Sequence, residues 1–528
     1  MRKSVDVAII GGGLAGNLLA RQLRRTIPGA SVALFERGVE RGWKVGESTV
    51  EIAAMYLTRR LGLASYLYQH HLPKNGLRFF FDTEAKDAEL TRMSEIGLRG
   101  LPPYPSFQLD RARLEADLLE MNRRDGVAVH VGVRVSDLTL ADDGGAHGFR
   151  VTDDDGGVEE WSARWVVDAS GRGGVISRLL DLKLPEREHR IAAAWGRVTN
   201  LRDMDDVPNE EWRARARYTA RSLSTNHFCY PGQWLWAIPL GEGVTSVGAV
   251  MEAPMWSRAL HDRDGFVAYL NEHRALRDLM DGAELHDHLF FTQLAFRTRR
   301  FYGQNRWACV GDAAAFTDPF YSPGSDFIAI ENDQVTDLVA RDLAGEDTGE
   351  RVEAYDEYIK LRFDVTMMLY TGQYQTFGSF ELFRAKVRFD CACYYHLWFD
   401  SYAQDEHLDL KAVRGLLRRK EPVLKAMENF SRLFRGTAER LRARGDYFRA
   451  NTDHNVLDGR EAFGPLETVG EKRRRPAVDR HTESIFNLAC EMVAPLLDAT
   501  AQPAKRPLWA FVEDADLLAP ERPEAAGA

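Results

Sequence analysis

The stretch Asp6–Gly16, which reads Asp-Val-Ala-Ile-Ile-Gly-Gly-Gly-Leu-Ala-Gly, decides the fold of this 528-residue chain. Its apolar first half is typical of a buried parallel strand, and it passes directly into the pattern G-x-G-x-x-G. In such a turn Gly11 bends the chain from strand to helix, Gly13 leaves room for a pyrophosphate, and Gly16 lets the helix pack closely on the strand. We therefore expect a Rossmann-type unit whose helix, over residues 13–25, directs its N-terminal amides at phosphate groups.

A second apolar strand, over residues 31–35, ends at Glu36, about 20 residues after the last glycine of the pattern. A carboxylate at this position binds the ribose hydroxyls of an adenosine and disfavours a 2′-phosphate, so the site suits FAD or NAD rather than NADP. Ala15, inside the glycine turn, and Glu36 join the three glycines as predicted cofactor-binding residues.

Two later segments favour FAD. Residues 164–172 form an apolar run that reaches Asp168 and a glycine, and residues 307–315 form another that runs into Gly-Asp312. They resemble the second and third FAD-contact motifs of the glutathione-reductase-type flavoproteins, in which the acid at the position of Asp312 binds the ribityl chain. The same resemblance implies that Arg111 approaches the cofactor. Alternatively, both acids are ordinary helix caps and Arg111 is a solvated helix residue.

Composition excludes several other classes of protein. The net charge of −10 and pI near 5.9 disfavour a nucleic-acid partner, and the basic run 472–476 is interpreted as a solvated loop. Five scattered cysteines predict neither a disulfide framework nor a metal site. No window approaches the roughly 18 apolar residues of a membrane span. A reduced, cytoplasmic protein without a membrane partner is expected.

The predicted fold class is α/β, with a mostly parallel Rossmann-type FAD-binding domain interleaved with a mixed β-sheet substrate domain and followed by a helical C-terminal region. The expected boundaries are 1–180 and 295–345 for the FAD-binding domain, 75–110 and 181–294 for the substrate domain, 346–518 for the helical region, and 519–528 for a disordered tail.

The most specific string is Trp234-Leu-Trp236-Ala-Ile-Pro239. Here the chain resembles the flavin-dependent halogenases, whose signature is W-x-W-x-I-P. The resemblance implies that Trp234 and Trp236 lie near the flavin and discourage ordinary monooxygenation. A strand with period-two alternation, in which both tryptophans fill the core, is the alternative.

Lys74 precedes a K-x-G-x-x-F strand, as the lysine of these halogenases does. A lysine in an apolar tunnel has a lowered pKa, and it can hydrogen-bond hypohalous acid or form a haloamine and pass the halogen to an electron-rich carbon. An exposed surface lysine is the alternative. Lys44 is not the family's lysine by position and is expected at the mouth of the flavin site or in solvent.

The segment Val45–Ser48 matches the V-G-E-S loop that passes over the isoalloxazine in this family, which implies flavin contacts for Gly46, Glu47 and Ser48. The usual continuation contains a proline, whereas this chain has Thr-Val-Glu51.

Residues 317–325 correspond to the D-P-x-x-S-[ST]-G loop in which these halogenases bind halide beside the flavin. The resemblance implies halide contacts from Ser322, Gly324 and Ser325, and flavin contacts from Pro319 and Gly324. Pro323 lacks an N–H and removes one of two consecutive donors, which costs about 1–3 kcal/mol of halide binding and argues against halogenation. Without the family, the loop is a turn before a helix that begins near Asp326.

Tyr321 stands where indole-type halogenases carry a glutamate, which favours a phenol, a pyrrole or a carrier-tethered ring over free tryptophan as the substrate. Further along, residues 379–402 form an aromatic stretch at helical spacing, suited to core or dimer packing and alternatively to a substrate wall. Asp390 and His396 are candidate acids or bases there.

The predicted function is halogenation of an electron-rich aromatic or carrier-bound natural-product precursor, using FADH2, O2 and chloride or bromide. The alternative is a monooxygenase that hydroxylates such a substrate. Both begin with reduced FAD and oxygen forming a flavin C4a-hydroperoxide. A non-oxygenating flavoprotein is a third class. No second G-x-G-x-x-G unit is present, so we expect a separate flavin reductase; a homodimer is also expected.

Overall fold

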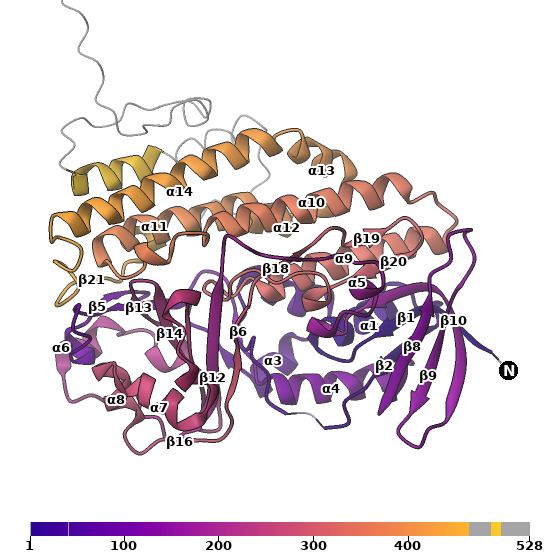
Figure 1. Cartoon of the computed structure of the whole chain (residues 1–528), viewed down its shortest axis with the longest axis horizontal. Helices are drawn as coiled ribbons and strands as arrows, with labels where there is room; N and C mark the ends of the chain where they lie inside the picture. Colours follow the sequence, from indigo (N-terminus) through magenta and orange to yellow (C-terminus); the bar gives the residue numbers. More distant parts are fainter. Residues whose placement is uncertain (1, 41, 464–486, 498–528) are drawn as a thin grey trace, which may run out of the picture.

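The computed structural model describes residues 2–40, 42–463 and 487–497. It contains an eight-stranded sheet and a nine-stranded sheet, which lie beside each other under a layer of C-terminal helices (Figure 1). This mixed architecture confirms the predicted α/β fold class with a helical C-terminal region.

The N-terminal strand β1 (Lys3–Ile10) lies in the centre of the eight-stranded sheet. Its parallel neighbours are β2 and β10, and β7 and β20 extend the parallel core outward. The bounds of the strands, in sheet order, are β19 (Tyr302–Gly303), β20 (Trp307–Cys309), β10 (Val158–Asp168), β1, β2 (Val32–Glu36) and β7 (Ala128–Val131), with β8 (Val133–Thr139) and β9 (His147–Asp153) attached antiparallel through β10.

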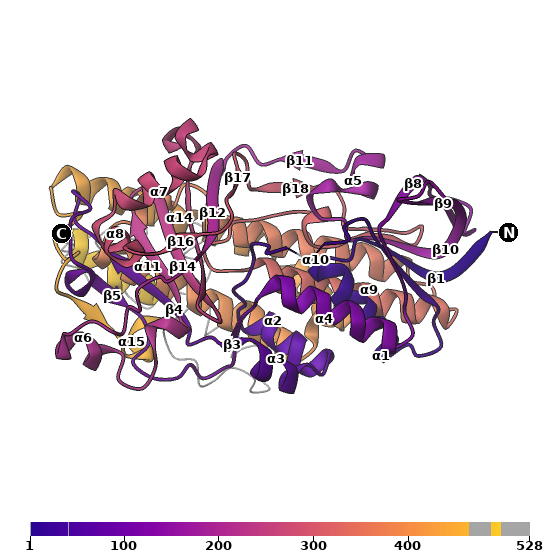
Figure 2. The same cartoon turned by 90° about the horizontal axis from the view of Figure 1, so that it is seen from below.

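Helix α1 (Leu14–Thr26) starts directly after the glycine turn, one residue later than predicted. It packs against α4 (Arg111–Arg124), which runs beside it in Figure 2, and against α9 (Gly324–Leu343). The parallel strands therefore direct their carboxyl ends toward the turn that precedes α1, where dinucleotides bind in such sheets.

The nine-stranded sheet is mixed, because most pairs are antiparallel while β4–β13 and β5–β21 are parallel. Its strands are, in order, β16 (Glu284–Leu285), β12 (Ile191–Thr199), β15 (Val244–Glu252), β14 (Gln233–Gly241), β13 (Thr225–Tyr230), β4 (Leu77–Phe81), β5 (Ser94–Ile96) and β21 (Asn455–Val456), with β17 (Leu289–Phe291) on β12. One face is covered by α6 (Glu210–Arg215), α7 (Arg263–Asn271) and α8 (Arg274–Met280), which share a separate hydrophobic core with it.

Long helices follow α9 and cover both sheets (Figure 1). They are α10 (Gly349–Met368), α11 (Phe380–Cys393), a π-helical turn (Tyr394–Phe399), α12 (Asp400–Ala403), α13 (Leu410–Leu417) and α14 (Lys420–Ala443), followed by the short α15 (Gly459–Phe463). The large hydrophobic core joins these helices to the parallel sheet and to the face of the second sheet that carries the two tryptophans.

Two details differ from the sequence-based expectations. Helix α9 begins at Gly324 rather than near Asp326, because Pro323 already has a helical backbone and accepts the N–H groups of Asp326 and Phe327. A strand, β21, also lies within the predicted helical region, where it completes the edge of the second sheet. The predicted tail and the basic run 472–476 fall outside the described residues. Among the helices that are described, none has the length and apolar character of a membrane span.

Candidate active site

The glycine turn has the geometry that its sequence predicts. Gly11 has a φ of +111°, and a Cβ atom there would lie 2.3 Å from the carbonyl oxygen of Ala169. A Cβ on Gly16 would lie 2.0 Å from the carbonyl oxygen of Gly11, so the helix packs on the strand only with glycine. Gly13 has open space within 4 Å of its Cβ position, on the side where a phosphate would approach the first amides of α1.

Glu36 lies at the end of β2 against this turn. Its carboxylate accepts the N–H of Gly12 at 2.5 Å and that of Gly38 at 2.7 Å. The acid predicted to bind a ribose therefore also holds the glycine turn in shape.

The two predicted FAD-motif acids differ in their surroundings. Asp168 accepts hydrogen bonds from the Ser170 hydroxyl at 2.6 Å and from the Ile176 amide at 2.7 Å, at the start of α5 (Val175–Leu179). It is therefore the helix cap of the alternative interpretation. Asp312 caps no described helix. Burial raises the pKa of its carboxyl group, while neighbouring cations, Arg172 first, oppose that rise.

Arg111 joins α4 to the V-G-E-S loop. Its guanidinium donates to the carbonyl oxygen of Val45 at 2.9 Å and to Glu115, whose carboxylate also binds Lys44. The Lys44 side chain is 42% exposed, as expected for a residue at the mouth of the site. Gly46 has a φ of +95°, and the Arg111 guanidinium lies 2.9 Å from its Cβ position, so only glycine fits the loop here.

Lys74 is buried, with 2% of its surface exposed, and is not the surface lysine of the alternative interpretation. Its ammonium donates to the Ser48 hydroxyl and to the carbonyl oxygen of Thr49, both at 2.8 Å. Burial lowers the pKa of Lys74 to about 8, and the carboxylates of Glu51 and Asp326 oppose this shift. The lysine and the V-G-E-S loop thus form one unit.

Trp234 and Trp236 lie on one face of β14, with ring centroids 5.6 Å apart. The Trp234 indole donates to the Tyr374 hydroxyl at 3.0 Å, and that hydroxyl donates to Asp318 at 2.7 Å. Trp236 donates to the Ser246 hydroxyl at 3.1 Å. The tryptophan motif is therefore connected through Tyr374 to the loop of residues 317–325.

The loop of residues 317–325 presents different backbone N–H groups from those that the family pattern implies. Ser322 has a φ of +57°, and its N–H donates to the carbonyl oxygen of Pro319 at 2.9 Å. Pro323 has no N–H. The next two amides, of Gly324 and Ser325, open α9 and have no hydrogen-bond partner among the described residues. Two consecutive free N–H groups are present, one residue later than expected.

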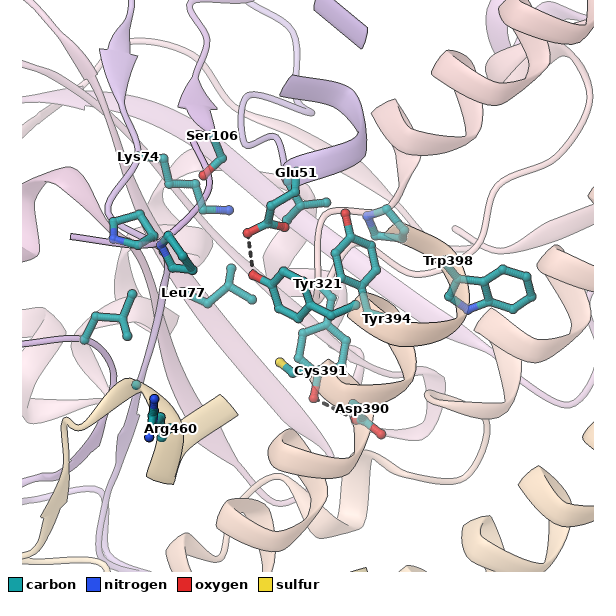
Figure 3. Close-up of a pocket in the computed structure, with 18 of the residues that line it drawn as sticks. Glu51, Lys74, Leu77, Ser106, Tyr321, Asp390, Cys391, Tyr394, Trp398 and Arg460 are labelled. Atoms are coloured by element: carbon teal, nitrogen blue, oxygen red, sulfur yellow. Dashed lines mark hydrogen bonds between the residues drawn. The ribbon is translucent and has the colours of Figure 1, made fainter. Parts of the chain in front are cut away.

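A cavity of about 690 Å³ lies between Lys74, this loop and the C-terminal helices (Figure 3). Tyr321 and Pro323 line it from the loop, and Glu51 and Asp326 line it from the starts of α2 (Glu51–Met55) and α9. The predicted lysine, tyrosine and proline are thus brought together around one space large enough for an aromatic ligand.

Sequence reasoning did not assign a role to Glu51 or Asp326. Glu51 accepts the Tyr395 hydroxyl at 2.6 Å, and Asp326 accepts the Ala53 amide at 2.8 Å and the Tyr394 hydroxyl at 3.0 Å. Burial raises the pKa of Asp326 to about 7 and also raises that of Glu51. The only sequence signal was that Glu51 replaces a proline of the family pattern.

The aromatic stretch of the C-terminal region both packs in the core and forms a wall of the cavity. Asp390, Tyr394, Tyr395 and Trp398 line the space, whereas His396 does not. Asp390 accepts the Tyr321 hydroxyl at 2.8 Å and the ammonium of Lys386 at 2.6 Å (Figure 3).

Comparisons with known proteins agree with this geometry. The family model described as "FAD binding domain" matches residues 4–362. The flavin-dependent halogenase chlA of Dictyostelium discoideum is 30% identical over 437 residues, which cover 76% of this chain and 71% of that protein. The chain belongs to the flavin-dependent halogenases.

Other halogenases are more distant in sequence. The 1H-pyrrole-2-carbonyl-(peptidyl-carrier protein) chlorinase of Pseudomonas fluorescens is 25% identical over 342 residues, covering 60% of this chain and 72% of that one. The crystal structure of halogenase PltM in complex with phloroglucinol and FAD has a TM-score of 0.67 at 17% identity, covering 92% of this chain and 96% of PltM, and shows the same fold.

This halogenase is an FAD-dependent oxidoreductase, and halogenation is favoured over the monooxygenase alternative. Its residues fit the cofactor: the glycine turn leaves space at Gly13, and the charge of Arg111, which binds the V-G-E-S loop, acts on the carboxyl group of Asp312. When bound, reduced FAD supplies the activation of oxygen that oxidises halide.

Proposed function

We propose that this halogenase uses chloride or bromide to halogenate an electron-rich aromatic ring held in the 690 Å³ cavity, and that Lys74 delivers the electrophilic halogen. The observation that carries the proposal is the position of the Lys74 ammonium. It is buried, it borders the cavity, and it is held by Ser48 and Thr49 of the flavin-contact loop.

Two of the three ammonium protons are engaged by Ser48 and Thr49, which leaves one N–H to bind the oxygen of hypohalous acid. Aromatic substitution then requires a base for the proton that leaves the ring carbon. Glu51 lines the same cavity, and its charge interacts with that of Lys74. We assign proton acceptance to Glu51.

For the halide, the free amides of Gly324 and Ser325 at the start of α9, beside Ser322, supply the donors. This pair compensates for the missing N–H of Pro323. The connection from Trp234 through Tyr374 to Asp318 fixes the same loop in place.

For the substrate and partners, we infer a phenol, a pyrrole or a carrier-linked ring. Tyr321 lines the cavity at the position where indole-type halogenases carry a glutamate, and aromatic side chains form the wall of the cavity. The related chlorinase is named for a carrier-bound pyrrole, and the PltM structure contains phloroglucinol. A separate flavin reductase supplies FADH2, and a homodimer remains a prediction, to be tested by light scattering.

The test compares the variants Lys74→Ala and Lys44→Ala. Each purified protein receives FAD, a flavin reductase, oxygen, bromide and an activated phenol or pyrrole, and products are read by mass spectrometry. Lys74→Ala should lose brominated product by at least about 100-fold, the usual range for loss of a proton-donating catalytic group. In Lys44→Ala the carboxylate of Glu115 loses Lys44 but still binds Arg111, so the amount of brominated product should stay within about twofold of the wild type.

Equal bromination by both variants would contradict the role of Lys74. An oxygenated product that ignores bromide and persists in Lys74→Ala would instead identify a monooxygenase. Equal FAD content of the two variants, measured by absorbance, shows that the difference arises after cofactor binding.

A further inference from the structure

Arg362, on α10, is a buried cation that borders the cavity with few partners. It is 3% exposed and lines the space. Its Nε and Nη1 atoms have no hydrogen-bond partner among the described residues, and its nearest carboxylate, that of Asp326, lies 4.0 Å from Nη2. A guanidinium has five N–H donors, and leaving them unsatisfied in a buried place is costly. A ligand that satisfies them is the physical explanation of this arrangement.

Two aromatic rings hold the guanidinium in position. Its central carbon lies 4.9 Å from the ring centroid of Trp398 and 5.7 Å from that of Phe327. Contacts with ring faces stabilise the charge but leave the in-plane N–H groups free for a ligand. Figure 3 shows Trp398 across the cavity from Lys74, with Glu51 and Tyr394 between them. Lys74 and Arg362 therefore lie apart along the cavity, which Arg99 and Arg460 also line.

The acids that face the cavity offset these charges only in part. Burial raises the pKa of Asp326 to about 7, so part of this carboxyl stays protonated near neutral pH, and burial also raises the pKa of Glu51. Of the other acids that line the cavity, Asp390 is paired with Lys386 and Glu461 with Arg384, and Asp458 accepts the backbone amides of Arg460 and Glu461. The guanidinium of Arg362 therefore makes its end of the cavity favourable for an anion.

We propose that Arg362 binds the carboxylate of a free aromatic acid and holds its ring between this anchor and Lys74. The inference rests on the proposed function and specifies its substrate class. The planar fork of a guanidinium matches a carboxylate through two parallel hydrogen bonds. A phenol, with an ordinary pKa near 10, is neutral at physiological pH, and a carrier-linked thioester has no charge at this position. A phenol or pyrrole that also carries a free carboxylate is therefore the kind of substrate that satisfies Arg362.

The experiment measures binding without turnover. The FAD-loaded protein, with no reductant, is titrated in a calorimeter at pH 7.5 with 2,4-dihydroxybenzoate and with its neutral analogue 2,4-dihydroxybenzamide. The wild type should bind the acid about tenfold or more tightly than the amide, the range for one charge-assisted bidentate pair. Arg362→Met should bind both equally, and Arg362→Lys should retain part of the preference.

The control is Arg297→Met. Like Arg362, Arg297 lies over an aromatic ring, in this case that of Phe363 on α10. It differs from Arg362 because its side chain is 39% exposed, pairs with Glu186 and does not line the cavity. It should keep the wild-type preference for the acid.

Equal binding of acid and amide by the wild type, no binding of the acid at millimolar concentration, or a preference that persists in Arg362→Met would each overturn the inference. The comparison of acid and amide in the wild type needs no variant, so it tests the inference even if Arg362→Met does not fold. The proposed function fails separately, when no halogenated product forms although the preference for the acid is intact.

Discussion

The cofactor turn and the substrate cavity of this halogenase are built in opposite ways. Around Gly11 to Gly16 the site consists of backbone: a positive φ at Gly11, open space at Gly13 and the first amides of α1, all within one short stretch of sequence. The cavity consists of side chains from distant segments, among them Lys74, Asp326, Arg362 and Trp398. The first site fits the FAD that the family uses, and we propose that the second holds the ring that this protein halogenates.

This difference predicts that the two sites tolerate change differently. A backbone site fails when any side chain enters it, whereas a side-chain site changes preference when one group is exchanged. The following variants test that distinction, from the largest expected effect to the smallest.

Gly16→Ala should abolish FAD binding and lower stability, because the new Cβ would meet the Gly11 carbonyl oxygen at 2.0 Å. The matched control is Gly29→Ala, whose Cβ position has nothing within 4 Å. FAD content by absorbance and the melting temperature are the measurements. A Gly16→Ala protein with full FAD content would show that the turn is not the backbone site described.

Gly13→Ala separates the cofactor from the fold. Gly13 has an extended backbone, with φ −77° and ψ −166°, and open space around its Cβ position, so alanine should leave the melting temperature of the FAD-free protein unchanged. A methyl group in the path of the pyrophosphate should weaken FAD binding about 10- to 100-fold, which corresponds to about 1.4–2.8 kcal/mol. Fluorescence titration with FAD measures the affinity. An unchanged affinity would show that the pyrophosphate does not bind beside Gly13.

Pro323→Ala adds one N–H to the halide loop without changing its backbone, since φ −77° and ψ −12° suit alanine. If the added amide faces the halide, the KM for bromide should fall about 10- to 100-fold, equivalent to one hydrogen bond to an anion. Pro254→Ala, in an exposed turn of the second sheet domain, is the control. An unchanged KM would indicate that the amides of Gly324 and Ser325 hold the halide by themselves.

Glu51→Gln removes the proposed proton acceptor and should lower the halogenation rate, and the activity that is left should have its pH dependence shifted by about one unit or less. The ammonium form of Lys74 is the hydrogen-bond donor, so the rate should fall as the pH rises through about 8. Glu51 raises the pKa of Lys74 through its negative charge, so the amide should move this falling limb to lower pH. The control is Glu461→Gln, a cavity carboxylate that is 46% exposed and salt-bridged to Arg384.

A rate that rises through pH 8 would contradict the ammonium as the active form. It would instead identify the neutral amine, and with it the haloamine route, as the one used.

The sequence predicted the parts of the site that depend on local chain geometry. The glycine turn, Glu36 and the strand that carries Trp234 and Trp236 are consequences of short-range pattern, and the structure has them in place. It singled out Asp312 as the ribityl acid only through the family resemblance, and it left open whether Asp168 and Asp312 are helix caps; the position of α5 shows that Asp168 accepts an amide at the start of that helix. It also did not predict β21, because a two-residue strand forms only where an edge is available.

By itself, then, the amino-acid sequence determined the α/β fold, the FAD turn and the halogenase character of this protein, because each depends on residues close together along the chain. Only the tertiary structure decided that Lys74 is buried, that Gly324 and Ser325 present the free amides, and that Glu51, Asp326 and Arg362 share one cavity. Burial, pKa and pairing are properties of what surrounds a side chain, and here those surroundings come from segments hundreds of residues apart.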